Sequence, residues 1–435
     1  MLIWVYRFLF PLLFVLALPF YLLRMLRRKG YREMLAGRVG NIQVPQKRDA
    51  QTRIWIQAVS VGELLAIETL IEQLVATENV ELVISTTTST GYKLAKEKYE
   101  ENAIAVVSFP LDFYLFSKKS WNRISPDIAI ITEGEIWPEH IHQAHRRNIP
   151  LVLINGRISD RSFRRMQKYG FFKNLAFTKV SKVAASSHLD AQRFVEIGVD
   201  QSKVSITGNL KFDAVSPNGM DQKTKAAFLS SISKSSSSNL ILLGASTWPG
   251  EEEMLIDISI LLKKESLPID LFLVPRHAER RGELRSMLKG KEGIRWSFRS
   301  NPDWRSDHTS DEDLLHVYVG DTTGELRKFV EIADVAVIGK SFPPHKDGQT
   351  PVEAIALGTP IVYGRTLGNF RAICKNLEEA EACVKESEPT LLKEKLQKLL
   401  TDQSIRLDLV AKGKTVFDRS KGSTERTLEL IKSYF

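Results

Sequence analysis

Carboxylates follow two strand-like segments in the first half of the chain. Glu63 ends the motif AVSVGE, and Glu133 and Glu135 lie in TEGEIWPE, directly after an apolar run. A carboxylate at the carboxyl end of a strand, facing a cleft, is suited to act as a general base. Ser60 and Glu63 also match the S-x-x-E capping box, in which the glutamate only holds the start of a helix. Spacing alone leaves both interpretations of Glu63 open.

Basic and helix-start residues elsewhere are typical of an anion-binding site. Lys211, in GNLKFD, can balance a negatively charged ligand, and Arg276 follows an apolar run in the second half. In GQTPVEA we expect Thr350 as a helix N-cap, Pro351 at N1 and Glu353 at N3. The free N–H groups of such a helix start can bind phosphate. A well-capped structural helix is the alternative, and spacing does not exclude it.

Several common site motifs are absent from the sequence. No G-x-G-x-x-G follows a strand-like run, and no G-x-S-x-G occurs, so dinucleotide binding and a hydrolase elbow have no support. GKS at 339–341 resembles the end of a P-loop, but Asp334 stands where its first glycine should be. His140, His142 and His145 invite a metal interpretation, but no fourth ligand is evident. A solvated, polar helix surface explains them better.

Alternating strand-like and helical patterns supply the elements that must position these residues. Such alternation predicts βαβ units and parallel sheets. A serine-rich stretch interrupts it, so we expect two Rossmann-like α/β domains, with the ligand site in the cleft between them at the carboxyl ends of the strands. Strands are expected over 54–59, 80–86, 127–132, 150–155, 182–186, 204–207, 240–244, 270–275, 316–320, 334–339 and 360–364.

Positive charge is concentrated near the N-terminus. The chain has 435 residues, 61 Lys and Arg, 52 Asp and Glu, and a formal net charge of +9. The first 53 residues contain ten basic and two acidic residues, and so carry +8 of that charge. The rest is nearly neutral, which excludes the broad basic surface of a nucleic-acid-binding protein. Two cysteines, Cys374 and Cys383, are too few for a disulfide scaffold or a four-cysteine zinc site.

An apolar run precedes most of these basic residues. Residues 1–23 contain one charge, Arg7, and no A-x-A cleavage pattern follows, so a signal peptide is not favoured. Flanking Lys and Arg attract anionic lipid and mark the cytoplasmic side. We expect a membrane anchor, which just spans the bilayer if Arg7 snorkels and otherwise inserts into one leaflet. An amphipathic helix packed on the protein itself is the alternative.

Eight motifs, in order, resemble the 3-deoxy-D-manno-octulosonic acid (Kdo) transferases of lipopolysaccharide synthesis. Together with the apolar N-terminal segment they cover nearly the whole chain. They are AVSVGE, TEGEIWP, NGRIS, GNLKFD, GASTWPGEE, VPRHAER, GDTTGEL and GQTPVEA. The resemblance implies the two-domain GT-B glycosyltransferase fold.

The resemblance also implies an activity and its partners. Kdo would move from CMP-Kdo to the tetraacyl disaccharide precursor of lipid A, with inversion and without a metal or cofactor. The enzyme would work at the cytoplasmic face of the bacterial inner membrane, with CMP-Kdo, lipid A precursor and membrane lipid, but no nucleic acid, as partners. The alternatives are another membrane-associated GT-B transferase that uses a different nucleotide sugar, and a catalytically inactive, membrane-attached binding protein.

Residue roles follow from the same resemblance. Glu63 would be the general base that takes a proton from the acceptor hydroxyl, and Glu133 and Lys211 would stabilise the transition state. The CMP of the donor would be bound by Pro275, Arg276, Thr323, Gly324, Glu325, Thr350, Pro351, Val352 and Glu353.

The sequence departs from the family pattern in a few places. Gln57 and Trp248 stand where the family often has histidine. The commonest loop, GGHNPLE, reads DGQTPVE here, with Gln349 and Thr350 in place of His-Asn.

We expect four segments along the chain. They are a membrane anchor with its basic flank over 1–29, an N-terminal acceptor-binding domain over 30–213, a linker region over 214–239, and a C-terminal CMP-sugar-binding domain with terminal helices over 240–435.

Overall fold

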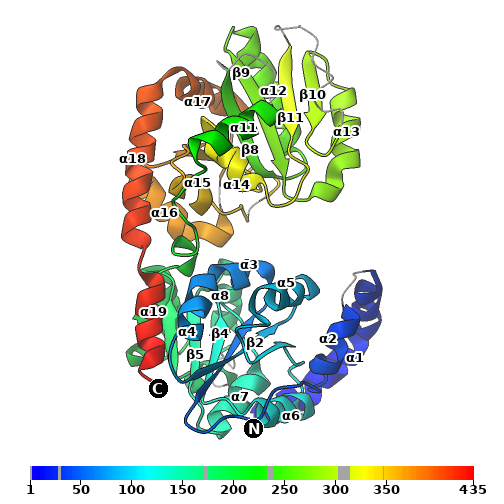
Figure 1. Cartoon of the computed structure of the whole chain (residues 1–435), viewed down its shortest axis with the longest axis vertical. Coiled ribbons are helices and arrows are strands. Elements are labelled where there is room, and N and C mark those ends of the chain that lie inside the picture. Colours follow the sequence, from blue (N-terminus) through cyan, green and yellow to red (C-terminus); the bar gives the residue numbers. More distant parts are fainter. Residues whose placement is uncertain are drawn as a thin grey trace. The chain divides into compact units, whose positions relative to one another are not determined.

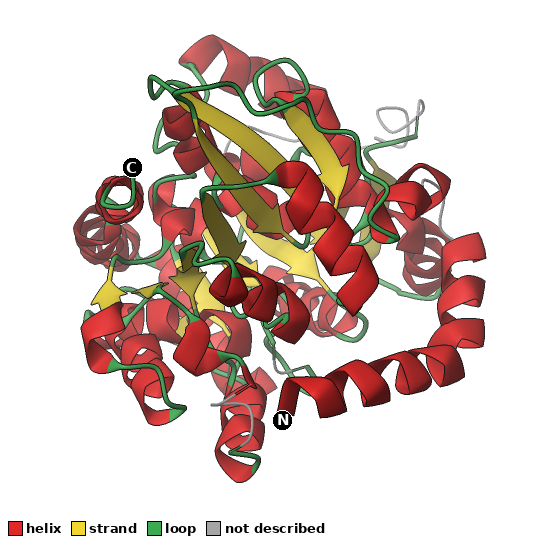
Figure 2. Ribbon diagram, turned by 90° about the horizontal axis from the view of Figure 1, so that it is seen from below, coloured by secondary structure: helices red, strands yellow, loops and turns green. Residues whose placement is uncertain are grey.

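The chain folds into two compact units, each built on one parallel sheet. The computed structural model describes residues 2–27, 31–170, 175–232, 239–301, 314–345, 347–365 and 367–435. The first unit consists of Met1–Ala214 and Ser420–Phe435, and the second of Val215–Arg419 (Figure 1). Figure 2 shows the strands of the units surrounded by helices.

The first unit contains a seven-stranded sheet in the order β3-β2-β1-β4-β5-β6-β7. All of its recorded pairings are parallel. The chain moves from β1 to one side through β2 and β3, and then crosses to the other side of β1 at β4. The strands are β1 (Thr52–Ala58), β2 (Val80–Thr86), β3 (Ala105–Ser108), β4 (Ile128–Thr132), β5 (Leu151–Gly156), β6 (Lys182–Ala185) and β7 (Val204–Ile206).

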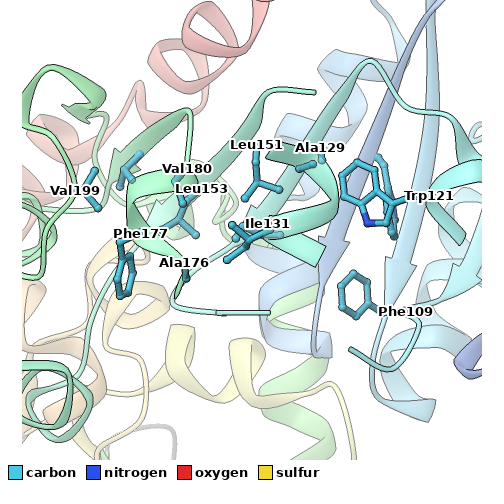
Figure 3. Close-up of a cluster of buried hydrophobic side chains, with 14 of the residues drawn as sticks. Phe109, Trp121, Ala129, Ile131, Leu151, Leu153, Ala176, Phe177, Val180 and Val199 are labelled. Atoms are coloured by element: carbon cyan, nitrogen blue, oxygen red, sulfur yellow. The ribbon is translucent and has the colours of Figure 1, made fainter. Parts of the chain in front are cut away.

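Helices cover this sheet and bury its apolar side chains on both faces. Successive residues of a strand point to opposite faces, so Ile54 and Ile56 of β1 enter one core cluster and Trp55 enters the other. The second cluster, with Phe109 and Trp121, is drawn in Figure 3. The helices are α1 (Leu2–Arg27), α2 (Tyr31–Arg38), α3 (Val61–Ala66), α4 (Glu68–Val75), α5 (Ser89–Tyr99), α6 (Tyr114–Ile124), α7 (Pro138–Arg146), α8 (Asp160–Lys168), α10 (His188–Glu196) and α19 (Ser423–Lys432), with the 3-10 turns η1 (Phe177–Lys179), η2 (Gln201–Lys203) and η3 (Leu210–Phe212).

The second unit also has a parallel seven-stranded sheet, but its strand order differs, because β11 lies between β9 and β10. Its seven-stranded sheet has the order β10-β11-β9-β8-β12-β13-β14, and the chain again crosses the first strand, β8, when it reaches β12. The strands are β8 (Leu240–Thr247), β9 (Ile269–Pro275), β10 (Ile294–Phe298), β11 (Leu315–Val319), β12 (Val335–Ile338), β13 (Ile361–Tyr363) and β14 (Val384–Lys385).

The helices of the second unit enclose one large apolar cluster. Leu242, Leu271, Val317 and Val337 contribute to it from four neighbouring strands. The helices are α11 (Gln222–Ile232), α12 (Glu251–Lys264), α13 (Arg281–Lys289), α14 (Leu326–Ile332), α15 (Val352–Ala356), α16 (Arg371–Glu379), α17 (Pro389–Thr401) and α18 (Gln403–Ser420), with the 3-10 turns η4 (Ala278–Arg280) and η5 (Gly368–Phe370).

The two parallel sheets confirm the predicted fold class, but some boundaries differ from the sequence expectation. The last helix of the domain expected over 240–435 belongs to the first unit instead, because α19 packs on α4. The carboxylate of Asp213 accepts hydrogen bonds from the N–H groups of Gly422 and Thr424, which fixes the start of α19. Part of the expected linker is the helix α11, which packs on α14 in the second unit. Residues 233–238 of the serine-rich stretch lie outside the described residues.

Three short strands, β3, β10 and β14, are missing from the sequence-based prediction. The single helix suggested by GELLAIETLIEQLVA is two helices, because Ile67 leaves the helical conformation between α3 and α4.

The N-terminal helix α1 has two different sides. Its segment Leu2–Pro19 is long and apolar enough to cross a membrane. Yet Tyr6 donates a hydrogen bond of 2.7 Å to Asp112, and Arg7 forms two hydrogen bonds of 2.8 and 2.9 Å with the buried carboxylate of Glu139. The opposite side is apolar and exposed, with Trp4, Phe8, Leu12, Leu13, Val15 and Leu16. The helix is therefore attached to the first unit and still presents an apolar surface.

Candidate functional site

Glu63 lies at the carboxyl end of the central strand β1, where the chain crosses from one side of the first sheet to the other. It follows β1, and Glu133 follows the neighbouring strand β4, so both lie at the carboxyl ends of the two strands that flank the switch point. Ligands of open α/β sheets bind in the crevice at this position. The structure thus brings together two of the predicted catalytic residues.

The Glu63 side chain does cap the start of α3. One carboxylate oxygen, Oε2, accepts hydrogen bonds from the Val59 N–H at 2.6 Å and the Thr132 hydroxyl at 2.8 Å. The Ser60 hydroxyl accepts from the Glu63 N–H at 3.4 Å. The second oxygen, Oε1, has only a long contact of 3.5 Å, with Ser60 Oγ, in the part of the chain that the structure describes. Capping therefore occupies one oxygen and leaves the other able to accept a proton.

Glu133 is held between two cations. Arg157 forms a hydrogen-bonded ion pair with one of its oxygens, and the Lys211 ammonium lies 3.3 Å from the other. Backbone geometry brings these residues together: Glu133 has a left-handed φ of 59°, and a Cβ on Gly134 would lie 2.6 Å from the Arg157 carbonyl oxygen. Only glycine at position 134 permits this close approach.

Asn155 attaches the Lys211 turn to the same edge. Its side-chain oxygen accepts a hydrogen bond of 3.2 Å from the Leu210 N–H at the start of η3. The Asn209 side chain caps the next N–H, that of Lys211. The motifs TEGE, NGRIS and GNLKFD therefore meet at one place, although they are far apart in sequence.

The charges at this edge perturb one another. Burial raises the pKa of Glu63, the negative charge of Glu133 raises it further, and the hydrogen bonds from Val59 and Thr132 oppose the shift. Burial also raises the pKa of Glu135 to about 7, with the charges of Glu63 and Glu133 adding to it. Burial lowers the pKa of Lys211, while Glu133 opposes this change. A carboxylate whose pKa is raised toward neutrality is a stronger base at physiological pH.

Sequence reasoning missed two members of this cluster. Arg157 was visible only as part of the motif NGRIS after an apolar run, and nothing in the spacing tied it to Glu133. Thr132, the last residue of β4, is buried and binds Glu63 across the sheet edge. Gln57, at the end of β1, is also buried, and its amide atoms have no hydrogen-bond partner among the described residues.

In the second unit the predicted donor residues lie after β9, β11 and β12, at the carboxyl edge of its sheet. Pro275 is buried at the end of β9, and Arg276 is exposed, with its N–H bonded to the Thr247 carbonyl oxygen at 3.1 Å. The Arg276 guanidinium has no ion pair within the described part of the chain. Thr323 and Gly324 are exposed, and Gly324 has a φ of 87° that favours glycine.

Glu325 is already paired in this structure. Its carboxylate binds the Arg299 guanidinium at 3.1 and 3.2 Å and accepts a hydrogen bond from the Thr322 hydroxyl. Burial alone would raise the pKa of Glu325, but the hydrogen bonds of Arg299 and Thr322 outweigh it and leave the pKa below its ordinary value. Its side chain thus ties the loop before α14 to Arg299 and stays ionised.

The helix expected with Thr350 as N-cap, Pro351 at N1 and Glu353 at N3 begins one residue later than predicted and is short. The Thr350 hydroxyl accepts a hydrogen bond of 3.3 Å from the Val352 N–H, and α15 covers only the five residues Val352–Ala356, with Pro351 as its N-cap. Pro351 and Val352 are buried, whereas Thr350 is exposed. Burial raises the pKa of Glu353, which Arg327 opposes, and no hydrogen bond to its carboxylate is present among the described residues. That carboxylate is available to hydroxyl groups of a ligand.

Helix α7, which carries the three histidines, matches neither of the two interpretations suggested by the sequence, a metal site or a solvated polar surface. His140 is buried, accepts a hydrogen bond of 3.1 Å from the Trp121 indole N–H, and has a pKa lowered by burial to about 3. Glu139 binds Arg7 of α1. Within the described residues, no group of three or more possible metal ligands gathers.

Known proteins resemble both the sequence and the fold of this chain. Residues 33–214 match the family described as 3-Deoxy-D-manno-octulosonic-acid transferase (kdotransferase), and residues 305–416 match the glycosyl transferases group 1. A 3-deoxy-D-manno-octulosonic acid transferase of Haemophilus influenzae is 30% identical over 438 residues, which covers 99% of each chain. Another, of Chlamydia trachomatis serovar A, is 26% identical and covers 90% of this chain and 88% of its own.

Solved structures share the fold at low sequence identity. Anabaena HepE, in complex with UDP, has a TM-score of 0.61 at 13% identity and covers 88% of this chain and 100% of its own. A putative UDP-N-acetylglucosamine 2-epimerase of Listeria monocytogenes has a TM-score of 0.58 at 13% identity and covers 89% of this chain and 97% of its own. These two likenesses concern the fold alone, which is of the GT-B type. By its full-length relatives and its two-sheet fold, the chain belongs to the 3-deoxy-D-manno-octulosonic acid transferase family and is a glycosyltransferase.

Proposed function

We propose that this enzyme transfers Kdo from CMP-Kdo to the tetraacyl disaccharide precursor of lipid A, with inversion at the anomeric carbon and without a metal. A hydroxyl oxygen of the acceptor forms the new bond to the anomeric carbon. The bond from that carbon to the phosphate oxygen breaks, and CMP leaves with the electron pair. The hydroxyl proton passes to Glu63.

The carboxylate of Glu63 carries this proposal. It is partly accessible, has an oxygen without a strong hydrogen bond, and has a pKa raised by burial and by Glu133. General base catalysis by such a group contributes about 10²–10⁴ in rate. Capping of α3 then serves catalysis as well, because it fixes the orientation of the base.

The neighbouring charges suit an anionic donor. Glu133, Arg157 and Lys211 together carry one net positive charge next to the base. A Kdo unit carries a carboxylate and the leaving group carries a phosphate, so excess positive charge stabilises both. Glu133 in turn supplies negative charge for an oxocarbenium-like transition state. Lys211, whose side chain is mostly buried, acts as a fixed cation.

The second unit supplies residues for the CMP of the donor. We assign Arg276, Thr323, Gly324 and the segment 350–353 to this role, with Pro275 shaping the backbone at Arg276. The Arg276 guanidinium is exposed and suited to an anion, and the Glu353 carboxylate can accept hydrogen bonds from ribose hydroxyls. Glu325 supports the loop through Arg299. The five-residue helix α15 has a small dipole, so its backbone N–H groups contribute mainly as hydrogen-bond donors.

Helix α1 gives the enzyme access to a lipid substrate. We infer that its exposed apolar side inserts into the cytoplasmic leaflet of the bacterial inner membrane, while Tyr6 and Arg7 attach it to the first unit. Confinement to the leaflet raises the local concentration of an acceptor that rarely leaves the membrane.

Incubation of the purified protein with CMP-Kdo and lipid A precursor tests the function. Release of CMP together with a product heavier by one or more Kdo units supports it, and the product mass also counts the sugars transferred. A different nucleotide sugar, such as a UDP-sugar, serves as the competing donor. Turnover with that donor but not with CMP-Kdo would contradict the proposal.

A further inference from the structure

The switch point of the second sheet carries Trp248 and Lys340. Strand β8 pairs with β9 on one side and with β12 on the other, so the chain reverses its direction of travel across β8. Trp248 directly follows β8, and Lys340 follows β12. These positions correspond to those of Glu63 and Glu133 in the first sheet. Ligands of open parallel sheets bind in this crevice.

A buried carboxylate fixes the two loops to each other. Glu251, which is 2% exposed, accepts hydrogen bonds from the backbone N–H groups of Trp248 at 3.0 Å and Lys340 at 2.8 Å. It also accepts from Ser341 at 2.9 Å. The loops are so close that a Cβ on Gly339 would lie 2.3 Å from the Ser246 carbonyl oxygen. The relative position of Trp248 and Lys340 is therefore set by the backbone.

Lys340 adopts a backbone conformation that favours glycine. Its φ is 59°, which strains a residue with a side chain. Its ammonium lies 4.7 Å from the centre of the Trp248 ring, in a cation–π contact, and 2.8 Å from the Asp347 carboxylate. Strain of this kind is typical of a ligand site.

Trp248 has a polar atom without a partner. Its indole N–H is buried and has no acceptor among the described residues. An indole nitrogen can only donate, and a buried donor without an acceptor is unfavourable. The Lys340 ammonium lies 4.7 Å from the centre of the same ring, so the two donors share one small region of the switch point. The half-exposed Asp347 carboxylate binds the ammonium in the structure as an external anion would.

We propose that Trp248 and Lys340 form a subsite for an anionic group of the nucleotide-sugar donor, and that Asp347 competes with that group for Lys340. The subsite rests on the proposed function, because that donor carries two suitable groups, the carboxylate of Kdo and the phosphate of CMP. Both offer negatively charged oxygens to an ammonium and an indole N–H. The ion pair between Lys340 and the exposed Asp347 is partly open to solvent and therefore weak, so a ligand that also binds the indole displaces Asp347.

Calorimetry with two probes tests the subsite without turnover. CMP is titrated first, and Kdo is then titrated into CMP-saturated protein. Lys340→Gly should lower the affinity for the probe that occupies the subsite by roughly 10- to 100-fold. Trp248→Phe, which keeps an aromatic ring but lacks the N–H, should lower it by roughly 5- to 10-fold. If the variants bind CMP more weakly, the subsite holds the phosphate. If only the affinity for Kdo falls, the subsite holds the carboxylate. The melting temperature of Lys340→Gly should stay equal or rise, since glycine adopts this φ without strain.

Asp347→Asn separates ligand binding from a structural role. If Asp347 competes with the ligand, this variant should bind the same probe roughly 2- to 5-fold more tightly. If the ion pair only orders the loop, the variant should bind it more weakly. Lys375→Ala is the matched control, because it removes one lysine charge whose partner, Glu379, lies on the same helix.

Unchanged affinity of Lys340→Gly for both probes would overturn the subsite, as would a wild-type protein that binds neither probe. The proposed function is tested separately by transfer: wild-type protein that binds the probes but transfers no Kdo contradicts the function and leaves the subsite supported.

Discussion

Replacement of Glu63 by glutamine separates catalysis from helix capping. In the structure a single oxygen, Oε2, accepts both the Val59 N–H and the Thr132 O–H. A glutamine side-chain oxygen in that place accepts the same two hydrogen bonds, so the cap is retained. The amide group cannot take the proton of an acceptor hydroxyl. We therefore expect kcat to fall by about 10²–10⁴ while the fold persists.

Stability should change in the opposite direction to activity. Because the pKa of Glu63 is raised in the folded state, folding is opposed once the carboxylate ionises: stability declines as the pH rises from the unfolded-state value through the folded-state pKa. A neutral glutamine avoids this penalty. At pH 8 we expect Glu63→Gln to be as stable as the wild type or slightly more so. Glu63→Ala, which leaves two donors without their acceptor, should lose about 2 kcal/mol.

The assay combines Kdo transfer, measured by product mass, with thermal melting at pH 8. Ser60→Ala is the matched control, because it removes the cap hydroxyl and spares the carboxylate. It should cost about 1 kcal/mol of stability and leave transfer within a few-fold of the wild type. Transfer by Glu63→Gln within about fivefold of the wild type would refute the base assignment, since proton abstraction should account for at least about 10².

Three further predictions follow from the same site and from helix α1. Transfer should decline as the pH falls toward 5, because Glu63 must be ionised and burial raises its pKa, while the neighbouring Glu135, whose pKa is raised to about 7, titrates beside it; a pH–rate profile that stays flat down to pH 5 would contradict this. Arg157→Gln should lower kcat by about tenfold with a smaller effect on the KM of the acceptor, because Glu133 loses one of its two cations; steady-state kinetics measure it, and an unchanged kcat would remove Arg157 from the site. Deletion of the first 23 residues should reduce transfer to membrane-embedded acceptor more than to detergent-dispersed acceptor, and equal losses in both assays would count against α1 as an anchor.

Much of the fold could be predicted from the sequence. The β-branched runs gave the positions of eleven strands, because buried parallel strands need continuous apolar segments. The strands that were missed, β3, β10 and β14, include one of only two residues and carry weaker apolar patterns. The break at Ile67 and the return of α19 to the first unit could not be predicted, since both depend on packing between segments distant in sequence.

The sequence allowed some residues of the site to be predicted, but not the partners that those residues bind. Glu63, Glu133, Lys211 and Arg276 stand out in the sequence because each follows a strand-like run. Their partners do not. Arg157 reaches Glu133 only because β5 pairs with β4 and because Gly134 permits a close backbone approach.

The sequence by itself therefore determined the α/β class, the apolar N-terminal helix and the family of this protein, because these depend on local composition and on motifs. The tertiary structure decided that Glu63 both caps a helix and keeps one oxygen with only a long hydrogen bond among the described residues, that two cations hold Glu133, and that Arg7 joins α1 to α7. It also decided that Trp248 and Lys340 meet across two loops fixed by Glu251. The reason is physical: pKa values, ion pairs and unpaired donors depend on burial and on distance in space, which strand order and close packing set and which sequence spacing does not contain.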